Sequence, residues 1–552
     1  MTRTGAWLQS AWRAVQSRPS ISCFVLGLVA ATGYPPLHLW WLAILALAAL
    51  VALLYDAPNW KAATWRGWLF GWAHLTLANN WIATAFTHQA KMPEILGWFA
   101  VPLLCVYLAV YPALAALSAH LLLRKVARPG SGFATFGLLL AATWILFEWM
   151  RSWAFTGYPW PPLSLLFLGG WETPGMAVLL PWVGTYGLSG LVLGLAASIA
   201  WGARIDRRLI GVASSATALG AVAVVMHGLP APTAQESNVS YALVQPRIPQ
   251  DEINDASKFE DQFGRIVDLT LPGNDTSRLV LWPESAIPDY LEDGYPQRYY
   301  DQTTAFNPVT RRGDPEFARL RIGSVIGAQS TLLTGVVNLD IGVSDGRRRA
   351  VSARNSVIAL NGEGEITKQY AKAHLVPYGE YLPMRPLLEP LGFSRLVAGS
   401  IDYLPGPGPE TLDLGVHGKA GVQICYEIVF SGQVVDRQDR PDYIFTPSND
   451  GWFGTWGPPQ HLGQARMRAL EEGLPVLRST TTGISAVIDA NGVVRQSIAM
   501  GEAAAVRGGI PQAHAPTLFG RFGNALPVGL ALIVILLSLT VPRLLALARW
   551  QR

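Results

Sequence analysis

Long apolar runs fill both ends of the chain, whereas the middle alternates short apolar and polar stretches. The runs suit helices that cross a membrane, for which a bilayer core needs ~20 residues. They lie at about 21–34, 39–55, 67–87, 96–123, 133–150, 176–201, 209–227 and 525–547. The first is short, but no small-residue cleavage site follows it, so we interpret it as a retained span. Eight spans are therefore expected.

Basic residues gather at alternate ends of these runs, which predicts their orientation. They occur before the first run and after the second, fourth, sixth and eighth, while the other loops carry few. Because loops rich in Lys and Arg stay in the cytoplasm, both termini are expected there. The interval between the seventh and eighth runs is then expected on the far side of the membrane.

The middle of the chain has the pattern of a layered α/β domain. Short β-rich runs recur at 239–244, 279–282, 332–337, 357–360, 421–424, 443–445 and 485–488, and helical patterns at 255–269 and 459–472. The Asn-Gly pairs at 361–362 and 491–492 indicate hairpin turns. Residues 376–408 are rich in Pro and Gly yet apolar, which favours a lid-like segment, with packing of a loop on the core as the alternative. Asn79 and Asn80, inside the third run, are expected either to join helices or to line a pathway.

Composition supports a membrane protein and argues against metal or nucleotide chemistry. Of 552 residues, 50% are hydrophobic and 14% charged, and mean hydropathy is +0.26. The nine histidines are scattered, and the sequence has no His-Glu-x-x-His motif, paired-cysteine motif or phosphate loop. No cofactor, metal or nucleic acid is expected. For His374 and His461 a structural hydrogen bond is the favoured interpretation.

Cys425 is the one cysteine of three that lies outside a strongly apolar run, and it ends the strand pattern 421–424. A buried inert thiol is the simplest interpretation of such a residue. A nucleophilic thiolate instead needs a base and a positive charge nearby. Glu284, which ends the apolar run 279–282, can be the base, and Lys372 can supply the charge and stabilise an oxyanion together with a backbone N–H near Tyr426.

The combination resembles a known superfamily. Trp282-Pro283-Glu284, Lys372 and Cys425-Tyr426-Glu427 are similar, in order, to the three blocks of the carbon–nitrogen hydrolase (nitrilase) superfamily, whose Glu-Lys-Cys triad sits on an α-β-β-α sandwich. With the flanking spans, the chain more closely resembles the bacterial apolipoprotein N-acyltransferase family. The stretches 155–160, 372–380, 449–454 and 460–471 add to this resemblance, while Arg247 stands where the family often has asparagine.

The resemblance implies a function and a site. The fold class would be a polytopic α-helical membrane protein carrying a nitrilase-like α-β-β-α sandwich. Residues 1–236 would hold spans one to seven, 237–516 the periplasmic catalytic domain, and 517–552 the eighth span and a cytoplasmic tail in the bacterial inner membrane. A phospholipid would donate an acyl chain through a thioester on Cys425 to the amino group of a diacylglyceryl-cysteine apolipoprotein.

The same resemblance assigns individual roles. Glu284 would be the proton acceptor, Lys372 the oxyanion stabiliser and Cys425 the nucleophile. Glu380, Tyr426 and Glu427 would support them, although a purely structural role for the two glutamates stays open.

Two other functions stay open as well. One is a membrane-anchored nitrilase-type amidase that acts on a small amide, and the other is a transporter or receptor with a ligand-binding outer domain.

Overall fold

In the computed structural model the chain divides into two compact units. It describes residues 12–88, 94–126, 132–204, 208–228, 230, 233–271, 277–344, 346–391 and 401–550. Unit 1 comprises 1–83, 95–230 and 522–552, and unit 2 comprises 84–94 and 231–521. The apolar runs of the sequence therefore gather in unit 1 and the α/β pattern in unit 2.

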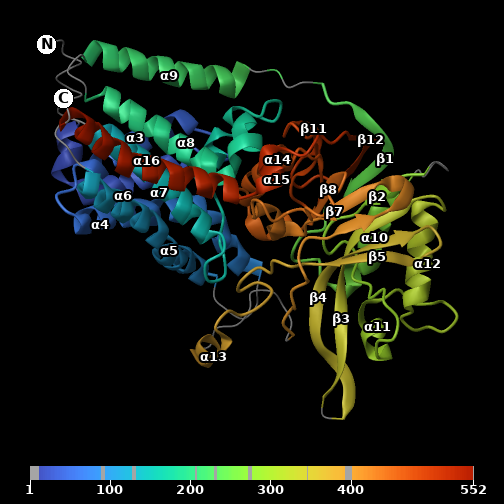
Figure 1. Ribbon diagram of the computed structural model, residues 1–552. Helices are drawn as coiled ribbons and strands as arrows, with labels where there is room; N and C mark the ends of the chain where they lie inside the picture. Colours follow the sequence, from blue (N-terminus) through green and yellow to red (C-terminus); the bar gives the residue numbers. More distant parts are fainter. Residues whose placement is uncertain are drawn as a thin grey trace. The chain divides into compact units, whose positions relative to one another are not determined.

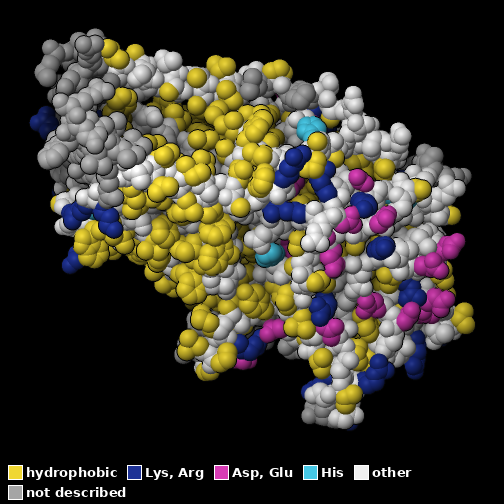
Figure 2. Space-filling model, viewed as in Figure 1, with side chains coloured by type: hydrophobic (Ala, Val, Ile, Leu, Met, Phe, Trp, Pro, Cys, Tyr) yellow, Lys and Arg dark blue, Asp and Glu magenta, His cyan; other side chains and the backbone are white. Residues whose placement is uncertain are grey.

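Unit 1 is built of helices (Figure 1). They are α2 (Pro19–Ala31), α3 (Trp40–Tyr55), α4 (Trp60–Ala78), α5 (Leu96–Leu108), α6 (Val110–Val126), α7 (Gly132–Arg151), α8 (Leu180–Gly202), α9 (Arg208–Gly228) and α16 (Ala525–Trp550). Short 3₁₀ turns accompany them at η2 (Leu163–Phe167) and η3 (Met176–Leu179), and η1 (Asn80–His88) begins in unit 1 and ends in unit 2. Hydrophobic side chains crowd the face of these helices in Figure 2, as expected for surface that meets lipid rather than water.

The helices follow the eight apolar runs with two differences. The third run was expected to begin at residue 67, but α4 begins at Trp60 and ends at Ala78. The fourth run is divided, because α5 ends before Ala109 and α6 begins after it. By length and apolarity, four helical stretches among the described residues can cross a membrane: Leu96–Lys125, Gly132–Arg151, Met176–Gly202 and Ile210–Gly228. Pro19–Ala31, Trp40–Tyr55 and Ala525–Thr540 are apolar but shorter.

A loop after α7 joins two of these helices through side chains. Tyr158 donates its hydroxyl hydrogen to Oδ1 of Asn79 at 2.7 Å, and Nδ2 of Asn79 donates to the Leu75 carbonyl at 2.9 Å. Asn79 is fully buried. Of the two expectations for this amide, the structure therefore supports a join between segments.

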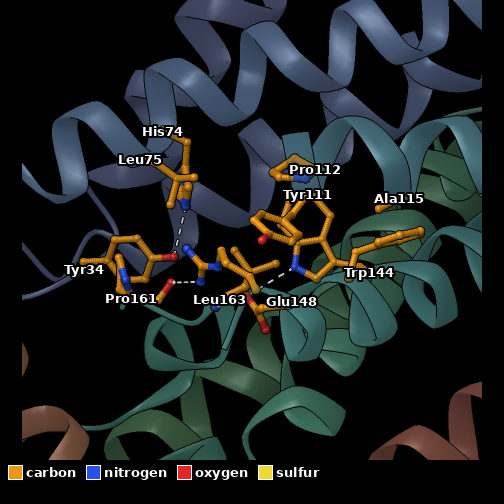
Figure 3. A pocket seen from close by; sticks show the side chains of 12 residues that line it. Tyr34, His74, Leu75, Tyr111, Pro112, Ala115, Trp144, Glu148, Pro161 and Leu163 are labelled. Atoms are coloured by element: carbon orange, nitrogen blue, oxygen red, sulfur yellow. Dashed lines mark hydrogen bonds between the residues drawn. The ribbon is translucent and has the colours of Figure 1, made fainter. Parts of the chain in front are cut away.

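Buried polar groups also meet around a small cavity in unit 1 (Figure 3). Its volume, about 20 Å³, is enough for a single water. Tyr34 hydrogen-bonds His74 at 3.0 Å, Glu148 accepts from the Trp144 indole at 3.3 Å, and Arg151 donates to the Pro161 carbonyl at 2.8 Å. These bonds compensate for placing polar groups among apolar helices.

Unit 2 contains two six-stranded sheets (Figure 1). The first has the order β12-β1-β2-β3-β4-β5 and the second β11-β10-β9-β8-β7-β6. The first sheet comprises β1 (Glu236–Gln245), β2 (Leu279–Leu281), β3 (Thr331–Ser344), β4 (Arg347–Asn361), β5 (Ile366–Ala371) and β12 (Ala504–Pro511). The second comprises β6 (Thr411–Asp413), β7 (Lys419–Val422), β8 (Tyr443–Ser448), β9 (Val476–Thr480), β10 (Ser485–Ile488) and β11 (Val494–Ile498).

The two sheets enclose one hydrophobic core, and helices cover the outer faces. Leu243, Leu281 and Val357 of the first sheet share a cluster with Val422 and Phe445 of the second. α10 (Phe259–Thr270) and α12 (Pro315–Ile326) place their apolar residues in a second cluster on the other face of the first sheet. α14 (Gly457–Glu472) packs against the second sheet and the turn after β7. The layered α/β expectation is confirmed.

Several of the predicted strands and turns are also confirmed, although the ends of some elements differ from the prediction. All seven expected strands exist, but the run 421–424 is wrong at its end, since β7 stops at Val422. The Asn-Gly turns join β4 to β5 and β10 to β11, which pair antiparallel. In the lid-like segment Leu382 is buried while Leu387 is exposed, and residues 392–400 lie outside the described part.

Candidate active site

Each of the three expected reactive residues lies just beyond the carboxyl end of a strand. Glu284 follows β2, Lys372 follows β5, and Cys425 follows β7. β2 is parallel to β1 and β3, and β7 is parallel to β8, which is parallel to β9. Ligands of open parallel sheets bind beyond these strand ends, where the chain turns from strand to helix. The topology explains why residues far apart in sequence meet.

Glu284 is held by donors on both carboxylate oxygens. Oε1 accepts from Nδ2 of Asn355 at 2.7 Å, and Oε2 accepts from the backbone N–H of Asn449 at 2.8 Å. The residue is only 7% exposed. Burial raises its pKa, and the Lys372 charge partly opposes that rise. A carboxylate with a raised pKa and a fixed orientation suits proton transfer.

Lys372 is almost completely buried between two carboxylates. Its Nζ lies 3.0 Å from Oε1 of Glu380 and 3.8 Å from Oε1 of Glu284. Burial alone would lower its pKa, but Glu380 and then Glu284 raise the pKa above the usual value. The ammonium therefore keeps its proton at every physiological pH. It can supply charge but cannot act as a base.

Cys425 occupies a sharp turn between β7 and the 3₁₀ turn η7 (Cys425–Val429). Its φ is +51°, a left-handed conformation that costs a non-glycine residue roughly 1–2 kcal/mol. The residue is 5% exposed, and burial, followed by the Glu284 charge, raises the pKa of the thiol well above its usual value. The charge of Lys372 opposes this rise. Glu284 and Lys372 are thus close enough to bear directly on the thiol's ionisation.

Glu427 connects the cysteine turn to the chain around Lys372. Its Oε1 accepts from the Tyr370 hydroxyl at 2.8 Å, from the Ala373 N–H at 2.7 Å and from the His374 N–H at 3.1 Å. Its Oε2 accepts from the Ile424 N–H at 2.8 Å. Burial raises the pKa of this carboxyl to about 7. Through these hydrogen bonds, Glu427 links β5 and the residues after it to the turn at Cys425.

Tyr426 and Glu380 lie in the same neighbourhood with different surroundings. Tyr426 is buried, and its ring meets Phe430 edge to face at 5.1 Å. Glu380 accepts from Asn355 at 2.9 Å and from the Val376 N–H at 2.7 Å, in addition to Lys372. The structure therefore brings together the six residues expected from the sequence.

Sequence reasoning overlooked the amide that orders the two carboxylates. Nδ2 of Asn355 donates to both Glu284 and Glu380, and the backbone carbonyl of Asn355 accepts from the Lys372 N–H at 2.8 Å. No spacing signal marks this residue, because its position follows from the antiparallel register of β4 with β5. Asn449 was noticed as part of a motif but not as a donor to Glu284.

A buried cluster behind Cys425 was also missed as a cluster. His461 hydrogen-bonds the Cys425 carbonyl at 3.0 Å and meets Asp450 at 3.1 Å, while Arg478 meets Asp450 at 2.5 Å. The structural hydrogen bond expected for His461 is confirmed. His374 stacks on Phe430 with ring centres 4.2 Å apart. Among the described residues, no three His, Cys, Asp or Glu side chains are grouped to hold a metal ion.

Comparison with known proteins divides the chain as the structure does. The apolipoprotein N-acyltransferase N-terminal domain model matches residues 26–198, and the carbon-nitrogen hydrolase model matches residues 241–502. The two sheets therefore form a nitrilase-superfamily fold.

Full-length relatives are similar along most of the chain. An apolipoprotein N-acyltransferase from Rhodopseudomonas palustris is 30% identical over 555 residues, covering 95% of this chain and 96% of that protein. Another from Caulobacter vibrioides is 31% identical over 547 residues, covering 95% of each. One from Bradyrhizobium diazoefficiens is 32% identical over 480 residues, covering 81% of this chain and 80% of its own.

Solved structures give more distant likenesses. One is an amidase from Nesterenkonia sp. AN1, whose active-site cysteine carries the acetamide moiety of fluoroacetamide. It is 14% identical with a TM-score of 0.33, and the match covers 54% of this chain and 96% of the amidase. Saccharomyces cerevisiae Nit3, of the nitrilase superfamily, is 19% identical with a TM-score of 0.33, covering 51% of this chain and 92% of its own.

Proposed function

Because the chain belongs to the apolipoprotein N-acyltransferase family, we propose that it moves a fatty acyl chain from a membrane phospholipid to the N-terminal amino group of a diacylglyceryl-cysteine apolipoprotein. The observation that carries the proposal is a buried site in which Lys372 lies 3.8 Å from Glu284, while Glu427 ties the turn at Cys425 to the chain beside Lys372. The site lies in the carbon-nitrogen hydrolase region of a chain that also holds long apolar helices.

The first half of the reaction forms a thioester. Since the resting Cys425 is a thiol, its proton must leave as Sγ attacks the ester carbonyl, and Glu284 accepts it. The carbonyl oxygen becomes an oxyanion, which the permanent charge of Lys372 stabilises. When the tetrahedral intermediate collapses, the C–O bond to the glycerol breaks. Glu284 returns the proton to the leaving oxygen, so a lysophospholipid departs and Cys425 keeps the acyl group.

The second half transfers that acyl group to nitrogen. Glu284 takes a proton from the amino group of the lipid-modified cysteine as the nitrogen attacks the thioester carbonyl. Lys372 again stabilises the oxyanion, and the C–S bond breaks. The thiolate recovers a proton from Glu284, which restores the starting enzyme and releases an amide.

The supporting residues fix this arrangement. Glu380 pairs with Lys372 and thereby holds the ammonium beside Glu284. Glu427 holds the N–H of Ile424, directly before the nucleophile. Tyr426 contributes the backbone N–H that follows the nucleophile.

The membrane arrangement is also part of the proposal. Eight spans would place 1–236 and 517–552 in the inner membrane, with 237–516 as the catalytic domain on the periplasmic side. It is supported by eight apolar runs, each with a helix, and by basic residues at alternate loops. A phospholipid and a lipidated protein both reside at that surface, so neither substrate needs to enter water.

The test is mass spectrometry of the purified protein after incubation with phospholipid and no acceptor. A fatty-acyl mass on the Cys425 peptide that neutral hydroxylamine removes is expected. Cys425→Ala, Glu284→Gln and Lys372→Ala should each lack the adduct while remaining folded, and Cys105→Ala, which removes a buried thiol in unit 1, is the matched control. An unmodified Cys425 in active, folded protein would refute the thioester route, and hydrolysis of small amides without acyl transfer would favour an amidase.

A further inference from the structure

Three charged or polar side chains form a fully enclosed cluster behind the cysteine turn. Asp450 lies just after β8, His461 on α14 and Arg478 within β9, and each is at most 2% exposed. Nη2 of Arg478 lies 2.5 Å from Oδ2 of Asp450 and 3.0 Å from Nδ1 of His461. Nε2 of His461 lies 3.0 Å from the carbonyl oxygen of Cys425. The cluster does not belong to the Glu284, Lys372 and Cys425 set, yet it ends on the nucleophile's own peptide group.

The contact with Cys425 fixes one hydrogen on the imidazole ring. A carbonyl oxygen only accepts hydrogen bonds, so Nε2 of His461 carries a hydrogen and donates it to Cys425. Burial and the neighbouring Arg478 charge lower the pKa of His461, and Asp450 opposes this effect. Nδ1 faces both Nη2 of Arg478 at 3.0 Å and Oδ1 of Asp450 at 3.1 Å, so these two side chains hold the far side of the ring. Asp450, whose own pKa is lowered by Arg478 and His461 against the effect of burial, remains ionised and anchors the guanidinium.

The bond to Cys425 determines the direction of the next amide. The Cys425 carbonyl and the Tyr426 N–H belong to one planar peptide group, which is trans. In a trans peptide the C=O and N–H point in opposite directions. By fixing the carbonyl, His461 fixes the line along which Tyr426 donates. A hydrogen bond accepted by the carbonyl also polarises the amide and strengthens its N–H as a donor.

Stability alone does not account for such a cluster. Removing the charges of Asp450 and Arg478 from water costs several kcal/mol each, and an apolar replacement of a buried ion pair is often neutral or better. What the cluster does provide is a defined imidazole orientation at the left-handed Cys425 turn, where φ is +51°. A left-handed residue persists only where its surroundings hold it.

We propose that Asp450, Arg478 and His461 are positioning residues that aim the Tyr426 N–H at the oxyanion formed when an acyl group is attacked by Cys425. The inference rests on the proposed function, because the oxyanion arises only if Cys425 is acylated. His461 acts through the peptide group and does not contact the substrate. The consequence is that His461 matters for attack on an ester carbonyl but not for the thiol's reaction with an alkylating agent, which forms no oxyanion.

The experiment compares two reactions of Cys425 in full-length protein held in detergent micelles. The probes are phosphatidylethanolamine without acceptor, read as acyl-thioester mass, and iodoacetamide, read as carbamidomethyl mass across pH 6–9. His461→Leu removes the donor and His461→Gln keeps an amide donor near Nε2. For His461→Leu we expect acylation to fall by about 10- to 100-fold, less than the ~10²–10³ for deleting an oxyanion donor outright. Alkylation should keep its wild-type rate and pH profile, and His461→Gln should recover much of the acylation.

Three outcomes overturn the inference. Acylation of His461→Leu at the wild-type rate would remove the role of His461. Parallel loss of acylation and alkylation would mean that the cluster only maintains the turn. If His461→Leu does not fold, ¹⁵N-histidine NMR of the wild-type protein decides instead, and a ring without a hydrogen on Nε2 at pH 7 contradicts the scheme. A wild-type protein that is alkylated at Cys425 but gains no acyl adduct would refute the proposed function itself. That result differs from a loss of acylation seen only in His461→Leu, which concerns the positioning role.

Discussion

Replacing Lys372 by Met removes the only cation described between Glu284 and Glu380, and the structure gives the size of the effect. Lys372 is 1% exposed and lies 3.0 Å and 3.8 Å from the two carboxylates. Breaking a buried pair by removing one partner costs about 3–5 kcal/mol, because the other charge stays buried without its partner. Lys372→Met should therefore lower the local stability by this amount and abolish acylation of Cys425.

Adding Glu380→Gln separates the structural part of this effect from the catalytic part. The double variant has one carboxylate fewer to leave unpaired, so about 2–3 kcal/mol of the lost stability should return as coupling between the sites. Acylation should stay absent, because neither variant has a cation at the oxyanion. Hydrogen exchange of the 372–380 peptide measures the local free energy of opening, and the Cys425 adduct measures activity.

The matched control is Lys368→Met, which removes an exposed lysine from β5, the strand that Lys372 follows. It should change local stability by less than about 0.5 kcal/mol and leave acylation intact. Equal effects of Lys372→Met and Lys368→Met, or no coupling with Glu380→Gln, would refute the buried pair. An acylated Lys372→Met protein would refute the role of the lysine at the oxyanion.

Two further changes test other parts of the structure. The pKa of Glu427 is about 7 in the folded protein against 4.5 ordinarily, so the folded state binds more protons than the unfolded state between these pH values. The free energy of unfolding should therefore fall by about 3 kcal/mol as pH rises from about 4.5 to about 7. Glu427→Gln should lack this slope in exchange measured at pH 5 and 7.5, and identical slopes would contradict the assignment. Arg247 is exposed and has φ +53°, a conformation that Asn adopts more readily than Arg. Arg247→Asn should therefore stabilise unit 2 by up to about 1 kcal/mol without changing acylation. A loss of stability would show that the guanidinium makes a contact that outweighs the backbone strain.

Much of the fold could be predicted because hydrophobic periodicity acts locally. The seven expected strands were the most apolar ones, such as β2 and β8, whose residues are all buried. β5 was missed because three of its residues are exposed and polar, and β9 because Arg478 interrupts a fully buried strand. In both cases pairing with neighbouring strands, which a local pattern cannot register, decides the structure.

The candidate catalytic residues also divide into those that the sequence indicates and those that only the family resemblance adds. The sequence by itself indicated Cys425 as a possible nucleophile and Glu284 and Lys372 as groups able to serve it, because a thiolate needs a base and a positive charge, but each of these signals is weak alone. The resemblance to a family added their order and the supporting Glu380, Tyr426 and Glu427.

Only the tertiary structure decided how these groups are held. Asn355 reaches two carboxylates because β4 pairs with β5 in one register, and His461 reaches the Cys425 carbonyl because α14 packs on the turn after β7. A hydrogen bond forms only when donor and acceptor are placed to within a few tenths of an ångström, and here the two groups are tens of residues apart in the chain. Residue type and spacing along the chain carry no such distances, whereas the packing of the two sheets and their helices fixes them.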